Sequence, residues 1–163
     1  MDPSHAVKKV AEELSREVDR FYAKHRGLSD EITSINLAAD AWSPKEIIGH
    51  LVDSAANNHQ RFVHLMLEEE LRFPEYFAEP WIGAQHFNGV EWQTLITLWR
   101  SYNLVLANIV RSIKPESLKH EWVLENNRVS LEFLVVDYLR HLRDHMTHFE
   151  KRLDELRAAG HGI

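Results

Sequence analysis

The segment from residue 131 to residue 156 constrains the fold most, because its side chains recur with the period of an α-helix. Apolar residues at three-, four- and seven-residue spacing place one continuous stripe on the inner face of such a helix. This stripe is Leu131, Val135, Leu142, Phe149, Leu153 and Leu156. A second inward stripe beside it is Leu134, Tyr138, His141, His145 and His148. The sequence therefore predicts a core helix that carries imidazole rings where leucine normally lies.

His141 and His145 suggest a metal site, because residues four apart on a helix have Cβ atoms about 6 Å apart. Two imidazoles at that separation can bind one ion, which would satisfy ring nitrogens that burial otherwise leaves without a partner. The spacing alone is weak evidence, since eleven histidines in this chain give about 0.7 such pairs by chance. The alternative is a histidine-rich helix with rings at the surface. A metal site needs a third ligand from elsewhere in the chain.

Three further segments show helical periodicity, so the chain is expected to form four helices at about 4–25, 44–70, 89–113 and 130–157. The second start is the best specified, because Ser43, Pro44 and Glu46 form a capping box with proline in the first helical position. Asn88 and Ser130 are expected to cap the third and fourth helices. With long connections, these helices predict an all-α four-helix bundle with two crossovers, in a single domain spanning residues 1–163.

The connections carry their own predictions. Residues 28–42 are expected to be irregular, and residues 116–129 to form a brief extended piece and a turn. Two prolines and a glycine exclude a long helix from 71–88, but the five aromatic residues of this segment predict an ordered loop. That loop either walls a pocket or merely covers the end of the core.

Composition excludes several classes of function. The formal net charge is -6 and no basic patch is present, which argues against nucleic-acid binding. No apolar run is long enough for a membrane span, and the first residues lack the apolar core of a signal peptide. The absence of cysteine excludes disulfides, thiolate metal ligands and cysteine nucleophiles. We therefore expect a cytoplasmic protein, and any metal must be bound through nitrogen or oxygen.

The second helix offers a candidate for the third ligand. His50 lies one position from the apolar seam of this helix, and Ser54, Asn57 and Arg61 follow at steps of four, three and four residues. The helix thus carries a polar stripe on a half-buried face. Taken alone, His50 fits an interior histidine with a hydrogen bond better than it fits a metal ligand.

Two strings of residues resemble the motifs of a known superfamily. WSPKEIIGHLVDS, residues 42–54, is similar to the second-helix motif of the DinB/YfiT-like superfamily. HLRDHMTHF, residues 141–149, is similar to its last-helix motif. Their order and separation also fit, and the resemblance covers essentially the whole chain. It implies a four-helix bundle that is often dimeric, with a divalent metal bound by His50, His141 and His145.

The resemblance also raises questions about the surroundings of the metal. The last-helix motif often continues with Gln and an aliphatic residue, where this chain has His148 and Phe149. His148 is then a fourth ligand, an interior polar residue, or a group that supports the ligands from outside the coordination sphere, and we favour the last. Asp53, Asn57, Asp137 and Asp144 are candidates to orient ligand N–H groups, and the alternative for each is a surface or ordinary helix role. Arg61 is expected to bind an anionic substrate or thiol cofactor.

Three neutral imidazoles suit Zn(II) or Ni(II) and leave a coordination position open. Superfamily members include metal-dependent transferases and isomerases that use low-molecular-weight thiols, and others are named hydrolases. The resemblance thus implies an S-transferase or hydrolase that acts on a small-molecule substrate, and its nucleophile is a water or thiol held by the metal. The alternative is a metal-binding stress or interaction protein without catalysis. A pocket beside an open position favours the enzyme, whereas closure by His148 favours the structural role. A homodimer is expected.

Overall fold

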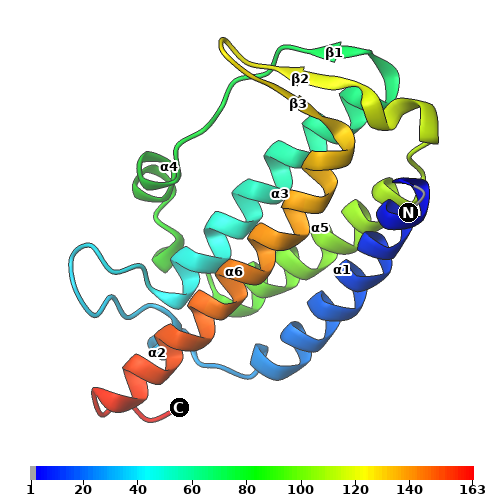
Figure 1. Cartoon of the computed structure of the whole chain (residues 1–163). Coiled ribbons are helices and arrows are strands. Elements are labelled where there is room, and N and C mark those ends of the chain that lie inside the picture. The colour runs from blue at the N-terminus through cyan, green and yellow to red at the C-terminus, as the bar shows by residue number, and fades with distance from the viewer. Residues whose placement is uncertain (1–2) are drawn as a thin grey trace.

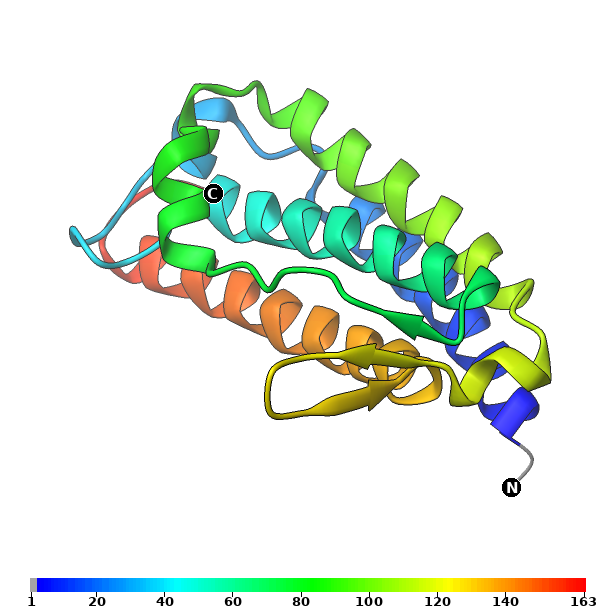
Figure 2. The ribbon, with the colours of Figure 1, turned by 90° about the horizontal axis from the view of Figure 1, so that it is seen from above.

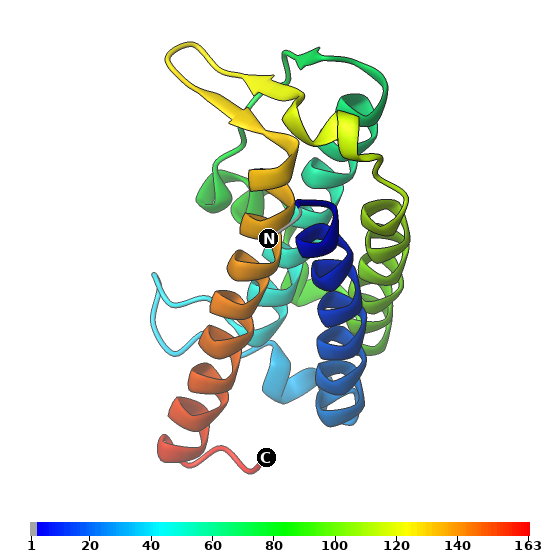
Figure 3. The ribbon, with the colours of Figure 1, turned by 45° about the vertical axis from the view of Figure 1, so that its right-hand side comes forward.

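The computed structural model describes residues 3–163, in which four long helices pack side by side (Figure 1). They are α1 (Pro3–His25), α3 (Pro44–Leu67), α5 (Trp92–Arg111) and α6 (Leu131–Ala158). Both α1 and α3 pack against α5 and α6, so that α1 and α3 lie diagonally across the bundle. The colours in Figure 3 show that α1 and α6 run in one direction and α3 and α5 in the other. The predicted all-α four-helix bundle is confirmed.

The three connections between the long helices are all long: the first crossover is residues 26–43, the second is residues 68–91, and the third connection is residues 112–130. Each contains short elements of its own. The first holds α2 (Asp30–Thr33), and the second holds β1 (Glu70–Leu71), α4 (Ala78–Gln85) and the 3₁₀ turn η1 (Phe87–Gly89). Between α5 and α6 come η2 (Pro115–Lys119), β2 (Glu121–Val123) and β3 (Arg128–Ser130). Figure 2 shows the second crossover and the β2–β3 hairpin lying along the side of the bundle formed by α3 and α6.

A small three-stranded sheet covers one end of the side formed by α3 and α6. Strand β1 pairs in parallel with β2, and β2 pairs antiparallel with β3, with Trp122 opposite both Leu71 and Val129. The prediction of an extended piece and a turn in residues 116–129 is therefore confirmed. Helix α3 ends at Leu67 rather than at the predicted residue 70. The reason is that the following backbone joins the sheet, where the Glu121 N–H donates to the carbonyl of Glu69 at 2.9 Å.

Helix α4 corrects the prediction that residues 71–88 form only a loop. Pro80 lies in the first turn of this eight-residue helix, where backbone N–H groups have no partner within the helix and proline is tolerated. The short α2 likewise interrupts the stretch 28–42, which was predicted to be irregular. Both helices are too short for periodicity to reveal them.

The helix starts follow two of the three predicted caps. The capping box of Ser43 and Glu46 is present, and the Ser130 hydroxyl accepts from the Phe133 N–H. The predicted cap at Asn88 was wrong, because α5 begins three residues later than expected, at Trp92. Its first N–H donates instead to the Asp30 carboxylate at 2.8 Å. A residue of the first crossover thus supplies the cap that the local sequence lacks.

The core lies between the four long helices. The whole apolar stripe predicted for residues 131–156 is buried, as are most apolar residues on the inner faces of the other long helices, whereas Leu67, Leu98 and Val105 are exposed. The largest fully buried side chains are Trp92, Trp99, Phe62 and Phe149. Within residues 3–163, no helix has the length and apolar character needed to cross a membrane. The core fixes the relative positions of α3 and α6, which carry the candidate site.

Candidate metal centre

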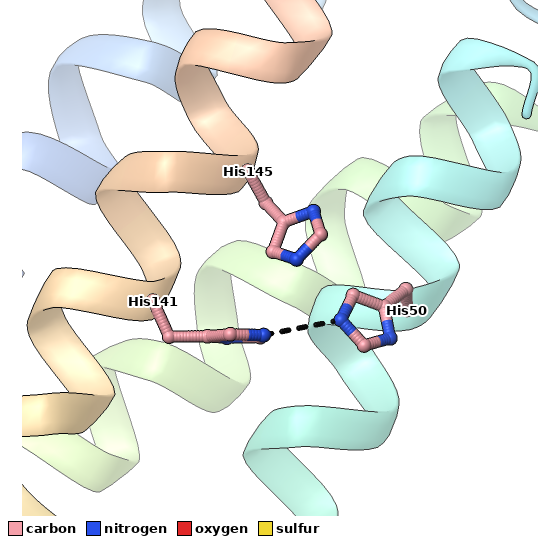
Figure 4. Close-up of side chains that lie close together, drawn as sticks. All are labelled: His50, His141 and His145. Carbon is pink, nitrogen blue, oxygen red and sulfur yellow. Dashed lines mark hydrogen bonds between the residues drawn. The ribbon is translucent and has the colours of Figure 1, made fainter. Parts of the chain in front are cut away.

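Three imidazole rings point toward one another in the space between α3 and α6 (Figure 4). His50 comes from α3, whereas His141 and His145 lie one turn apart on α6. One nitrogen from each ring lies within 4.8 Å of the other two. The Nε2 atoms of His50 and His141 are 3.2 Å apart. The fold thus brings together the three residues that the sequence motifs single out.

The spacing of these nitrogens fits a transition-metal ion. Two nitrogens bound tetrahedrally to zinc at 2.0–2.1 Å lie about 3.3 Å apart. The separation of 3.2 Å between the Nε2 atoms of His50 and His141 is close to that value. His145 completes a group of three residues whose nitrogens all lie within 4.8 Å of one another. Nitrogen-only ligands suit Zn or Ni and do not suit Mg or Ca.

Burial keeps the three rings neutral. It is the main cause of a pKa of about 3 for His50 and about 4 for His145, with a smaller effect from the positive charges that the neighbouring rings would carry. Burial also lowers the pKa of His141. An imidazole binds a metal only in its deprotonated form. At neutral pH the three rings therefore offer lone pairs without first having to lose a proton.

The protein itself leaves these rings incompletely satisfied. His50 is only 5% exposed, and within residues 3–163 its Nδ1 atom has no hydrogen-bond partner. The same holds for the buried Nδ1 of His145. Bound ligand histidines usually donate the second ring N–H to a carboxylate or carbonyl. Here the ring of Trp42 lies against both histidines, with centroids 5.2 Å from His50 and 6.2 Å from His145. Aromatic packing therefore orients the two rings.

Four residues expected around the metal make other contacts. The carboxylate of Asp53 accepts from Gln85 of α4 at 2.8 Å, and burial raises its pKa to about 6. Asn57 donates to the Asp53 carbonyl, and Asp144 pairs with Arg140 at 2.7 Å. His148 lies outside the group of converging nitrogens, with its ring centroid 5.9 Å from that of His145.

Two cavities adjoin the three histidines. One of about 290 Å³ is bordered by His141 and extends along α3 and α6 to Arg61. Another of about 250 Å³ is bordered by His145, His148 and Trp42. The aromatic segment 71–88 contributes Tyr76 to the larger cavity, so it walls a pocket, which was one of its two predicted roles. Sequence reasoning did not assign Trp42 or Tyr76 to the site, although Trp42 directly precedes the capping box.

Comparisons with known proteins agree with this description. No family model matches the chain. A protein of Oceanobacillus iheyensis named "putative metal-dependent hydrolase" is 23% identical over 124 residues, which are 76% of this chain and 71% of that protein.

Similarity in structure extends further along the chain. YfiT from Bacillus subtilis, described as "a probable metal-dependent hydrolase with an unusual four-helix bundle topology", aligns with a TM-score of 0.77 and 17% sequence identity. The alignment covers 98% of this chain and 89% of YfiT. The helix order, the crossovers and this alignment together show that the chain has the DinB/YfiT-like four-helix-bundle fold.

Proposed function

We propose that this chain is a metal-dependent enzyme that acts on a small molecule, with a divalent transition metal bound by His50, His141 and His145. Zn(II) and Ni(II) are the ions that best suit three neutral imidazoles. Hydrolysis is the favoured reaction class because both similar proteins carry that description. Transfer to a low-molecular-weight thiol is a second reaction that the same site could support.

The observation that carries the proposal is the position of the larger cavity. His141 belongs to the converging histidines and also borders a space of about 290 Å³. Because His148 does not join the three nitrogens, an ion bound by these histidines would have three protein ligands and would retain a coordination position for water or substrate. A purely structural site would instead have four protein ligands and no adjoining cavity.

The ion and the protein side chains would contribute different parts of the chemistry. A bound divalent ion would act as a Lewis acid and lower the pKa of a water or thiol. The three histidines would hold the ion, and Trp42 packs on two of their rings and fixes their orientation. Tyr76 and residues of the β2–β3 hairpin line the adjoining cavity. No side-chain nucleophile is needed in this scheme.

A direct test compares turnover of chromogenic ester, amide and phosphoester substrates by zinc-loaded, nickel-loaded and chelator-treated protein. The triple variant His50→Ala/His141→Ala/His145→Ala removes the proposed ligands, whereas His5→Gln/His64→Gln/His86→Gln removes three histidines elsewhere. We expect turnover that requires metal, is retained by the control variant and is lost in the triple-alanine variant.

The same samples test thiol transfer when an electrophilic chromogenic substrate and a thiol are supplied. Turnover only in the presence of the thiol would replace hydrolysis with transfer at the same centre. Metal binding without either reaction would support a non-catalytic metal-binding protein instead. A homodimer and a cytoplasmic location remain predictions, which light scattering and cell fractionation would test.

A further inference from the structure

Arg61 of α3 is a buried cation without a carboxylate partner. Its side chain is 7% exposed, and no acidic side chain of the described residues lies within 4 Å of its guanidinium nitrogens. Its Nε–H is also buried without a hydrogen-bond acceptor in residues 3–163. A buried charge is normally paired, because removing it from water is unfavourable. The guanidinium of Arg61 therefore lacks, within the described residues, the anionic partner that a buried cation normally has.

Aromatic rings hold the guanidinium in place. Its central carbon lies 3.8 Å from the centroid of the Trp122 ring and 6.0 Å from that of Phe73. Trp122 is itself fixed, because its indole N–H donates to the Phe73 carbonyl at 2.8 Å. Stacking of this kind occupies a face of the planar guanidinium and leaves the N–H donors at its edges available. Those edges suit a carboxylate or a phosphate, which accept two parallel hydrogen bonds.

The free donors border the larger cavity, which also reaches the candidate metal centre at His141. Two carboxylates border this cavity as well. Asp137 is already paired with Arg140 at 2.7 Å, and Glu75 is exposed at the rim. Arg61 is thus a buried charged group of the cavity wall. The charge of Glu75 acts on Arg61, but within the described residues it forms no ion pair with the guanidinium.

We propose that this cavity binds small molecules that carry a carboxylate or phosphate group, with that group paired to Arg61. The proposal rests on the proposed function for the reacting end of the molecule, which would face His141. His50 and Arg61 are eleven residues apart on α3, so their Cα atoms are separated by about 16 Å along the helix axis. The substrate is therefore an elongated organic anion rather than a simple inorganic one.

The test uses chelator-treated full-length protein, so that an anion cannot bind through a metal. Isothermal titration calorimetry at constant ionic strength compares phenylphosphate, phenylacetate and the uncharged analogue phenylacetamide. We expect both anions to bind at least about tenfold more tightly than phenylacetamide. Phenylphosphate and phenylacetate distinguish the two anion classes, since the preferred group identifies the one that the substrate carries.

Matched variants connect binding to Arg61. Arg61→Gln and Arg61→Lys should each weaken anion binding about tenfold or more, because neither retains the planar fork. Arg72→Gln removes the same charge from an exposed position near the hairpin and should leave affinity unchanged. Circular dichroism shows whether each variant is folded.

A measurement on the wild-type protein avoids any folding defect in the variants. The buried Arg61 Nε–H should give its own nuclear magnetic resonance signal, which we expect to shift as phenylphosphate saturates the site. Equal binding of phenylacetamide, no saturable anion binding in the millimolar range, or an unshifted Arg61 signal at saturation would overturn the proposal. Metal content and turnover are separate readouts, so failure of the metal centre leaves this result interpretable.

Discussion

Replacing Gly49 with alanine tests how the second crossover is fixed against the helix that carries His50. Gly49 lies immediately before His50 in α3, and the buried ring of Phe87 in η1 packs directly on it. A Cβ atom added at Gly49 would overlap that ring, with Cε2 of Phe87 only 2.5 Å away. Carbon atoms in contact normally lie about 3.5–4.0 Å apart, so the ring must move by about 1 Å or more.

The net effect is a difference between two opposing contributions. Overpacking of a core typically costs about 1–3 kcal/mol, whereas alanine stabilises a helix interior by about 1 kcal/mol relative to glycine. Because Phe87 is 7% exposed and held by its own turn, we expect overpacking to exceed the helix gain. The free energy of unfolding should fall by about 1–2 kcal/mol, which corresponds to roughly 2–8 °C in melting temperature for a domain of this size.

Urea unfolding monitored by circular dichroism measures this change. Gly83→Ala is the matched control, because Gly83 also lies in a helix but an added Cβ atom there meets nothing within 4 Å. The control should be neutral or slightly stabilised. Adding Phe87→Ala should make the Gly49 substitution harmless, since the obstructing ring is gone. Stabilisation by Gly49→Ala alone would refute the close packing of Phe87 on α3.

Three further predictions concern the site and its support. Trp42→Ala should weaken zinc affinity about tenfold in a competition assay, whereas Trp42→Phe should retain most of it, because ring packing orients His50. Burial raises the pKa of Asp53 to about 6, so ionisation of Asp53 lowers the free energy of unfolding progressively as the pH rises from about 4 to about 6, and the loss is complete above that range. Asp53→Asn should therefore add roughly 1–3 kcal/mol of stability at pH 7.5 and about half of that at pH 5 in urea titrations. Tyr138→Phe should lower the free energy of unfolding by about 1–3 kcal/mol, because it leaves the side-chain amide oxygen of the buried Asn103 without its hydrogen-bond donor.

The sequence was sufficient to predict features that local rules govern. Helical periodicity located the four long helices, and the capping box at Ser43 gave the start of α3. The histidines converge because two inward-facing seams, one on α3 and one on α6, meet across the core. The assignment of these histidines as ligands came from the superfamily resemblance together with these stripes, and it stays a prediction until a metal is measured.

Features that depend on contacts between residues far apart in the sequence could not be predicted from it. The cap of α5 comes from Asp30, which is 62 residues earlier in the chain than Trp92. The pairing of β1 with β2 joins segments on either side of α5. The stacking of Arg61 on Trp122 depends on that same pairing, because β2 places the indole beside α3. Periodicity contains no information about such partners.

The most direct test of the central claim is elemental analysis of protein purified without a histidine tag. The measurement is made on the wild type, on the triple variant His50→Ala/His141→Ala/His145→Ala and on the control His5→Gln/His64→Gln/His86→Gln. We predict about one zinc or nickel ion per chain in the wild type and the control, and none in the triple-alanine variant. A wild type that stays metal-free after reconstitution, or a triple-alanine variant that retains its ion, would contradict the three-histidine centre.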